Sequence, residues 1–300
     1  MGYIYAAGDF TTRTVKKLRT FNLALVAESA DYGGGIRCLA VNSGFVYIGG
    51  GTTQKIWKLR ATDLVKVAES ADYGGEITAL VAADADFVFF VGATTEVVRK
   101  VQKSDLAWVA DSADYGPGTP QALGEDSGFV YVSDADTKVR KLQKSNLASV
   151  ATANVAYTNV INAISVDTDF VYTGGFTLWR VRKYNVSDMT YVLDSDSYGD
   201  TIRAIVNDAG FVYEAGDMWA VKKLQKPNLG EVWAGASYGD DIYALAQDAD
   251  FIYMGGQAAN WVKKIRKSDG TLVDPPSANF GGTVRALGIS VGGGGWVQII

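Results

Sequence analysis

Carboxylates are the only side chains in this sequence whose type and spacing suggest catalysis. The 300 residues contain no histidine and a single cysteine, which excludes His-based triads, Cys/His pairs and His-containing metal sites. Asp134 and Asp136 are two residues apart, Asp240 and Asp241 are adjacent, and Asp217 lies in a variable segment. Two carboxylates could hydrolyse a glycosidic bond or bind a hard cation.

Turn chemistry gives a simpler interpretation of these aspartates. Asp is common in turns because its side chain bonds the backbone two residues later. The sequence also lacks a D-x-D-x-D-G loop with a distal Glu, the pattern of a calcium loop. We therefore expect turn residues, no metal ion and no catalytic site, and we keep a polysaccharide-acting enzyme built on these carboxylates as an alternative.

A repeat of 40 to 42 residues must position all of these groups. The segment SADYGG and its variants end each unit with an aromatic residue, found at Tyr32, Tyr73, Tyr115, Tyr157, Tyr198, Tyr238 and Phe280. A V-x-K-L segment recurs with the same spacing, and its lysines are Lys17, Lys58, Lys100, Lys141, Lys183, Lys223 and Lys264. The two series keep a constant offset, so the chain consists of seven equivalent units.

Each unit contains four short β-prone segments: I-x-A-L, F-V-Y, V-x-K-L and V-A-x-S. A period of about 40 to 45 residues with four strands is typical of a propeller blade. The sequence therefore predicts an all-β, seven-bladed β-propeller of four-stranded antiparallel blades, occupying residues 1–290 as one domain. The chain begins at a second strand, so we expect residues 1–33 and 282–290 to share the blade that closes the ring.

Units such as ITALVAADADFVFFVGATTEVVRKVQKSDLAWVADSADYG, residues 77–116, resemble the broad group of PQQ-like, YVTN-type and WD40-like propellers. The resemblance implies the fold and leaves the activity open, because this fold carries many functions. The Trp-Asp and Gly-His motifs of WD40 repeats are absent. Quinoprotein members of the group typically have eight blades with tryptophan docking repeats, so no cofactor is expected here.

Recurrent residues are best interpreted as blade architecture, because every blade must be built. We expect the repeated tyrosines to pack between blades, and the repeated lysines to bury their stems and pair their heads with a carboxylate or carbonyl. Positions that break the repeat are the better candidates for function.

Aromatic residues break the repeat in loops on one face of the ring. Strand alternation places the loops between second and third strands on the same side as the connections between blades, and we call this side the top face. Its variable loops contain Phe176, Trp179, Met218, Trp219 and Trp261. These side chains suit sugar stacking or a protein interface, or each simply covers the edge of its own blade.

The last ten residues, 291–300, fall outside the repeat and read VGGGGWVQII. A glycine tether followed by a short apolar segment containing Trp296 could add a strand to a neighbouring subunit. Equally, the segment could fold back over its own propeller or plug the channel.

Charge and composition limit the partners. The net charge of −5 disfavours nucleic acid and anionic lipid, and we expect no signal peptide and no membrane insertion. The predicted location is the cytoplasm or a particle assembled there, such as a virion. We predict a non-catalytic binding or assembly module that contacts a protein, itself or a glycan through the tail or top face. A lectin is one alternative and the polysaccharide-acting enzyme is the other.

Overall fold

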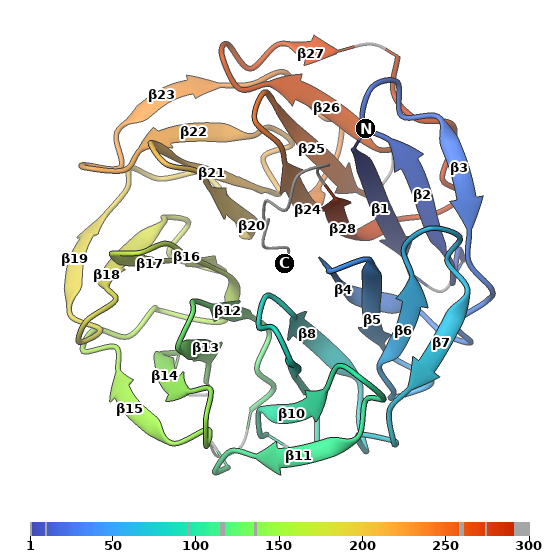
Figure 1. The fold of residues 1–300 in the computed structure, drawn as a ribbon. Helices are drawn as coiled ribbons and strands as arrows, with labels where there is room; N and C mark the ends of the chain where they lie inside the picture. The colour runs from blue at the N-terminus through green and yellow to red at the C-terminus, as the bar shows by residue number, and fades with distance from the viewer. Residues whose placement is uncertain are drawn as a thin grey trace.

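The computed structural model describes residues 2–9, 11–94, 96–114, 118–134, 137–257, 261–273 and 275–290. Seven four-stranded antiparallel sheets form a closed ring (Figure 1), which confirms the predicted seven-bladed β-propeller. Within these ranges, no helix is long and apolar enough to cross a membrane.

The strands of each blade run outward from the central axis in sequence order, except in the closing blade. The innermost strands are β28 (Val284–Ser290), β4 (Ile36–Asn42), β8 (Ile77–Val81), β12 (Leu123–Glu125), β16 (Ile161–Val166), β20 (Ile202–Asn207) and β24 (Ile242–Gln247). The second strands are β1 (Tyr3–Gly8), β5 (Phe45–Gly50), β9 (Phe87–Gly92), β13 (Phe129–Ser133), β17 (Phe170–Gly175), β21 (Phe211–Gly216) and β25 (Phe251–Gly256).

The two outer strands of each blade are short. The third strands are β2 (Val15–Arg19), β6 (Trp57–Arg60), β10 (Arg99–Gln102), β14 (Val139–Gln143), β18 (Arg182–Asn185), β22 (Lys222–Gln225) and β26 (Lys263–Arg266). The outermost strands are β3 (Leu25–Glu28), β7 (Lys66–Glu69), β11 (Trp108–Asp111), β15 (Ser149–Thr152), β19 (Tyr191–Asp194), β23 (Glu231–Ala234) and β27 (Leu272–Val273).

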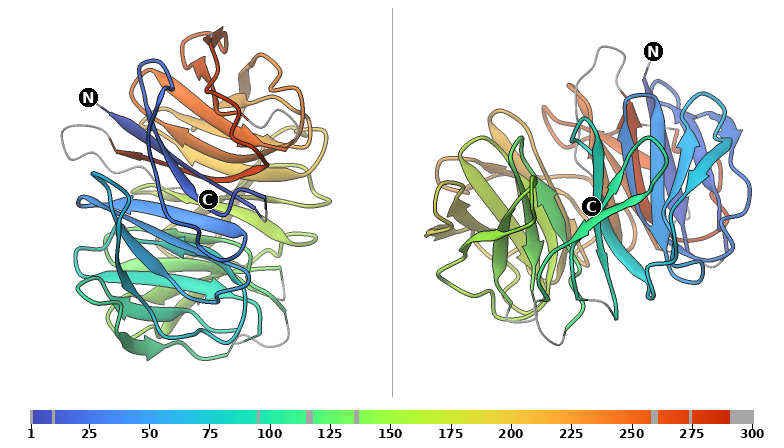
Figure 2. Two further views of the ribbon diagram at one scale, coloured as in Figure 1. Left: turned by 90° about the vertical axis from the view of Figure 1, so that its right-hand side faces the viewer. Right: turned by 60° about the horizontal axis from the view of Figure 1, so that its bottom comes forward.

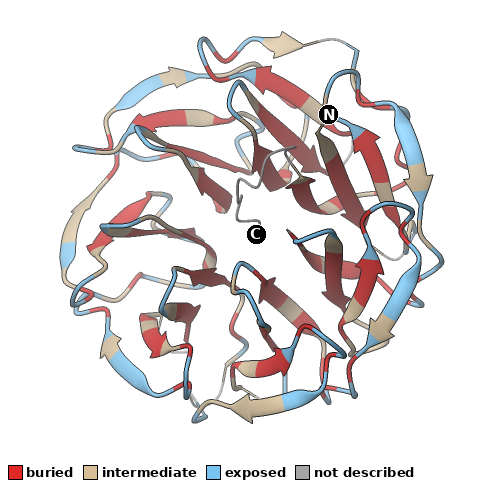
Figure 3. Ribbon diagram, viewed as in Figure 1, coloured by how far each residue is buried: buried red, intermediate tan, exposed pale blue. Residues whose placement is uncertain are grey.

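The hydrophobic cores lie between neighbouring blades. One cluster joins Tyr47 and Ile56 of the β4–β7 blade to Leu80 and Phe90 of the β8–β11 blade. Because a blade is covered on both faces, five of the six residues in most second strands are buried, whereas the outermost strands are largely exposed. Figure 3 shows this gradient from a buried centre to an exposed rim.

The ring closes by pairing the two ends of the repeat region. β28 lies antiparallel to β1, with Tyr3 opposite Ser290 and Ile4 opposite Ile289. Closure gives this blade its fourth strand and covers the inner edge of β1, which would otherwise be open.

Aspartates shape the hairpins between first and second strands. In the β20–β21 hairpin, Asp208 Oδ1 accepts hydrogen bonds from the main-chain N–H groups of Gly210 and Phe211 at 3.1 and 3.0 Å. The equivalent residues Asp84, Asp126, Asp167 and Asp248 accept the same pair of bonds. These hairpins lie on the face opposite the top face, and Figure 2 shows the ring from two further directions.

Candidate ligand site at the top of the central channel

All seven inner strands contribute to one cavity of about 330 Å³ on the channel axis. Each supplies the variable residue of its I-x-A-L segment or the equivalent position, which is Arg37, Thr78, Gln121, Asn162, Arg203, Tyr243 or Arg285. These residues lie at or just before the starts of the inner strands, where the chain enters each blade from the top face. We call this cavity the channel mouth.

A β-bulge directs these side chains toward the axis. In β20 the register against β21 shifts between Ile202 and Ala204, which are buried in two different apolar clusters, whereas Arg203 between them is only partly buried and lines the cavity. A bulge leaves one residue unpaired and redirects its side chain. The blades therefore fix the backbone of the mouth, while its chemistry varies from blade to blade.

Three arginines of the mouth face three carboxylates, with unequal geometry. Arg37 Nε donates to Glu76 Oε1 at 2.7 Å. Arg203 binds Asp217 through both Nε and Nη2, the latter at 2.9 Å. Arg285 Nε lies 3.8 Å from Asp9 Oδ2, too far for a hydrogen bond.

Tyr243 lies between two of these arginines. Its ring centroid is 4.8 Å from the Arg203 guanidinium carbon and 4.0 Å from that of Arg285. Its hydroxyl donates to Gln257 Oε1. Guanidinium groups at these distances from an aromatic face are attracted by its electron density, so β20, β24 and β28 build a wall of two arginines around one aromatic ring.

The other side of the mouth is neutral. Thr78 Oγ1 donates to the main-chain oxygen of Pro120 at 2.6 Å, Asn162 Nδ2 to that of Ile202 at 3.3 Å, and Gln121 Nε2 to that of Thr119 at 3.3 Å. Within the described ranges, the amide oxygens of Asn162 and Gln121 accept no hydrogen bond. This side therefore offers acceptors for hydroxyl groups.

An exposed tryptophan connects the top-face loops to the mouth. Trp219, in the β21–β22 loop, donates its indole N–H to Asp241 Oδ1 at 3.2 Å, and Asp241 directly precedes β24. Burial raises the pKa of Asp241, the neighbouring Asp217 raises it further, and the Trp219 bond and Arg203 oppose the change. Trp219 is half exposed, so its ring is accessible, and its partner Asp241 lies two residues before Tyr243 of the mouth.

The other aromatic candidates lie on the same set of loops. Phe176 and Trp179 follow β17, Met218 adjoins Trp219, and Trp261 follows β25; all are exposed. Trp219 alone among the described candidates has a hydrogen bond that leads toward the mouth. Trp296 lies outside the described residues, as does the rest of the 291–300 tail, so its docking role stays a prediction.

Trp179 and Trp219 adopt a left-handed backbone conformation, with φ of 56° and 64°. Other blades hold polar residues there in the same conformation, namely Gln54, Glu96 and Thr137. The loop geometry therefore imposes this conformation on whichever residue occupies the position. A bulky aromatic residue is unfavourable in it, so these tryptophans are not explained by local backbone preference.

The remaining acidic candidates that the structure describes, Asp134 and Asp240, form hydrogen bonds within the top-face loops. Asp134 has a side chain only 1% exposed, and it accepts bonds from Lys138 N and Arg140 Nε, both at 2.8 Å. Asp240 accepts the N–H of Asp241 at 2.7 Å. Asp136 is not among the described residues. In the part of the chain that the structure describes, no group of three His, Cys, Asp or Glu side chains is arranged for a metal ion.

The recurrent tyrosines join neighbouring blades. Each hydroxyl of the described tyrosines in this series donates to a main-chain oxygen in the loop between second and third strands of the following blade, whereas Phe280 occupies the equivalent place without a hydroxyl. The pairs are Tyr32 with Lys55, Tyr73 with Val97, Tyr157 with Arg180, Tyr198 with Ala220 and Tyr238 with Trp261. Tyr115 lies outside the described residues.

The recurrent lysines make a second set of links between blades. Each Nζ donates to main-chain oxygens in the turn between third and outermost strands of the next blade. The pairs are Lys17 with Ala61, Lys58 with Lys103, Lys100 with Lys144, Lys141 with Val186, Lys183 with Lys226, Lys223 with Lys267 and Lys264 with Thr20 and Phe21. Each head also lies within 3.6 to 4.6 Å of the centroid of an aromatic ring.

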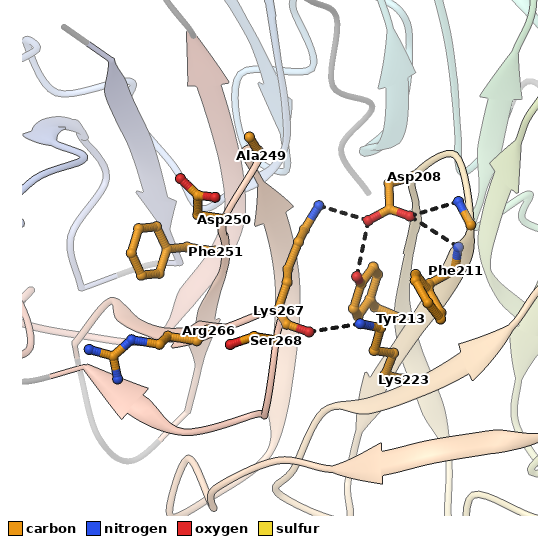
Figure 4. Close-up of a pocket in the computed structure, with 11 residues that line it drawn as sticks. Asp208, Phe211, Tyr213, Lys223, Ala249, Asp250, Phe251, Arg266, Lys267 and Ser268 are labelled. Atoms are coloured by element: carbon orange, nitrogen blue, oxygen red, sulfur yellow. Dashed lines mark hydrogen bonds and ion pairs between the residues drawn. The ribbon is translucent and has the colours of Figure 1, made fainter.

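A larger cleft of about 590 Å³ opens on the opposite face, between the β20–β23 and β24–β27 blades. Figure 4 shows Lys267 crossing this cleft to Asp208, at 3.0 Å, and Tyr213 donating to the same carboxylate. One blade earlier, a cleft of about 550 Å³ has Asp167 and Lys226 in the same places. Because recurrent residues line both clefts, we interpret the clefts as part of the blade architecture. The channel mouth is the better candidate for a ligand site.

Sequence reasoning missed the mouth residues. The signal was present: the second residue of I-x-A-L changes from unit to unit, and is polar in all seven, while its neighbours stay apolar. Such a position can be recognised as a candidate site once the seven inner strands are known to surround a common axis.

Comparisons with known proteins identify the fold. No family model matches the sequence, and no curated protein matches it. Among solved structures, 1516 chains match. One is the crystal structure of the computationally designed Ika8 protein, with a TM-score of 0.74 and 14% identity over 98% of this chain and 92% of that chain. At this identity the likeness concerns the fold alone, and the chain is a seven-bladed β-propeller of four-stranded blades.

Proposed function

We propose that this propeller is a non-catalytic binding module that takes a carbohydrate at the channel mouth. The proposal is supported by the second residue of the I-x-A-L segment, which differs between blades although the rest of the segment is repeated. Seven blades with a shared architecture place seven polar side chains around one cavity, and the chemistry of these side chains varies. A cavity of this size accommodates a small ligand group.

The chemistry of the lining favours a polyhydroxylated ligand. Asn162 and Gln121 supply free amide oxygens, and arginine guanidinium groups supply fixed donors. Trp219 presents an exposed ring whose indole N–H is bonded to Asp241 at the edge of the mouth. An aromatic face beside hydrogen-bonding groups suits a sugar, which has both apolar C–H surfaces and hydroxyl groups.

Binding without turnover is proposed because most of the carboxylates are already engaged. Asp217 is held through both oxygens by Arg203, and Asp134 is buried in its ion pair with Arg140. Asp241 favours hydrolysis as the second candidate function, because burial and the nearby Asp217 raise its pKa. Two neighbouring carboxyl groups are the usual arrangement in glycosidases.

A glycan array followed by calorimetric titration tests the binding function. Trp219→Ala is expected to weaken the binding of an array ligand about tenfold, since buried tryptophan contacts commonly contribute more than about 1 kcal/mol. Trp108→Ala is the matched control: Trp108 is also exposed and also bonds a nearby carboxylate, Asp111 at 3.1 Å, but lies on the outermost strand β11. An array without ligands, or equal losses in the two variants, would count against the proposal.

Measurement of reducing ends separates binding from hydrolysis. The native chain is expected to release no product from the glycans that it binds. Release that disappears in Asp241→Asn, with binding retained, would establish the enzyme in place of the binding module.

A further inference from the structure

Arg285 differs from the other arginines of the channel mouth because its Nε–H group has no acceptor within the described residues. Within the described ranges its Nε is buried and has no hydrogen-bond partner, and its nearest carboxylate oxygen is 3.8 Å away, in Asp9. Arg37 and Arg203 donate directly to Glu76 and Asp217. A buried donor without a hydrogen bond is unfavourable. A ligand that places an acceptor atom on this N–H group would therefore bind more tightly.

Tyr243 fixes the Arg285 guanidinium group. The guanidinium carbon lies 4.0 Å from the ring centroid, and Arg203 lies 4.8 Å from the same centroid. A planar guanidinium held in one orientation presents paired N–H groups that match the two oxygens of a carboxylate. Little side-chain entropy remains to be lost when such a ligand binds.

The charge balance of the mouth disfavours a doubly charged anion more than a singly charged one. Three arginines face three carboxylates, those of Asp9, Glu76 and Asp217, so there is no excess positive charge for a dianion. Asp241 is also near Arg203. A phosphate group carries about two negative charges and a carboxylate group carries one. The carboxylates of the mouth would therefore repel a bound phosphate more strongly than a bound carboxylate.

The opposite wall fits the rest of the same ligand. Asn162 and Gln121 line the neutral side of the cavity, and their amide oxygens can accept bonds from hydroxyl groups. A ligand with one carboxylate and several hydroxyls would satisfy both walls at once.

We infer that the channel mouth recognises a sugar acid, with the carboxylate on Arg285 and the hydroxyls on the Asn162 and Gln121 side. This inference rests on the proposed carbohydrate function and adds the chemical class of the ligand. The carboxylate displaces none of the close ion pairs, because Arg37 and Arg203 keep Glu76 and Asp217.

A glycan array with four matched arms tests the inference: uronic or sialic acid glycans, their methyl esters, the neutral sugars and phosphorylated sugars. We expect binding of the acids and a loss of about 10-fold to 100-fold in affinity for the methyl esters, the range of a charged hydrogen bond. Equal binding of acids and neutral sugars would overturn the inference and leave the proposed function standing. Preference for the phosphates would overturn it in favour of general anion binding.

Substitutions of Arg285 test the assigned contact. Arg285→Gln is expected to remove the preference for acid over ester, and Arg285→Lys to retain little of it because the planar pair of donors is lost. Arg60→Gln is the control for net charge; Arg60 is an exposed partner of Asp63 at the far end of β6. Unchanged acid preference in both folded Arg285 variants would overturn the inference, and absence of any glycan ligand would overturn the proposed function with it.

Discussion

Lys223 and Lys267 are joined across a blade boundary. The Nζ of Lys223 donates to the main-chain oxygen of Lys267 at 2.8 Å, and it lies 3.8 Å from the ring centroid of Phe211. Burial lowers the pKa of Lys223, with Asp208 opposing the change. The same contact recurs at every blade boundary, so the seven links close around the ring.

Replacement of Lys223 tests the contribution of one link. Lys223→Met keeps most of the apolar stem but removes the charged donor, and we expect the free energy of unfolding to fall by about 1 to 2 kcal/mol. Denaturant unfolding measures this change. Lys66→Met is the matched control, because Lys66 also lies over an aromatic ring, Trp57, but pairs with Glu69 in solvent. Its expected effect is below about 0.5 kcal/mol, and equal losses would show that the link between blades is unimportant.

Gly216 occupies a place where the backbone of one strand approaches another. A Cβ atom there would lie 1.9 Å from the main-chain oxygen of Thr201. Gly216→Ala must therefore displace β20 or β21, and we expect a loss of about 2 kcal/mol or more in unfolding free energy. Gly210→Ala is the control, since its Cβ would meet nothing within 4 Å. A tolerated Gly216→Ala, with an unchanged melting temperature, would contradict this account.

The blade architecture could be predicted because the same four strand segments recur in seven sequence units. The spacing of Tyr32 and its equivalents, the four strand segments and the split closing blade all follow from the period. The individual partners of these residues could not be predicted, because a repeat shows which residue recurs and not which atom it contacts in the next blade. The Tyr32 hydroxyl donates to the main-chain oxygen of Lys55, and the Lys17 ammonium group donates to that of Ala61. A main-chain oxygen is present in every residue, so the sequence does not show which one is the partner.

The candidate site was harder to predict for the opposite reason. Arg203, Tyr243 and Arg285 come from three units, about 40 residues apart, and meet only when the ring closes. The sequence singled out exposed loop aromatics instead, and of these Trp219 bonds Asp241, two residues before Tyr243 of the mouth.

Glu214 interrupts the apolar layer between two blades. The equivalent positions in the other second strands hold Ala6, Ile48, Phe90, Val132, Thr173 and Met254, so Glu214 is the one ionisable residue at this position. In the described structure both carboxyl oxygens of Glu214 are buried and lack a hydrogen bond. Burial raises its pKa to about 8, with Lys222 opposing and Glu231 adding to the change.

The raised pKa of Glu214 makes stability depend on pH. The native state keeps the proton up to about pH 8, whereas the unfolded chain loses it near its usual value of 4.5. Between these pH values the unfolded state binds fewer protons, so unfolding free energy falls as pH rises, by at most about 1.4 kcal/mol per pH unit. The decrease should level off above the folded pKa.

Glu214→Met, which copies Met254 of the next blade, isolates this effect. The difference in unfolding free energy between the variant and the native chain is expected to grow from pH 5 to pH 8 in favour of the variant. Denaturant titrations at several pH values measure it. A constant difference over this range would mean that Glu214 ionises normally in the folded protein.

Trp179 gives a test of the two interpretations of the loop aromatics. Its left-handed φ of 56° is unfavourable for a bulky residue and is tolerated well by asparagine. If the exposed indole serves a ligand, Trp179→Asn should raise the free energy of unfolding by up to about 1 kcal/mol and weaken glycan binding. Trp108→Asn on strand β11 is the control, and it should lower stability because asparagine is disfavoured in strands. If Trp179→Asn instead destabilises the protein by more than about 1 kcal/mol and leaves binding intact, the ring covers the edge of its own blade, and ligand contact is confined to Trp219 and the channel mouth.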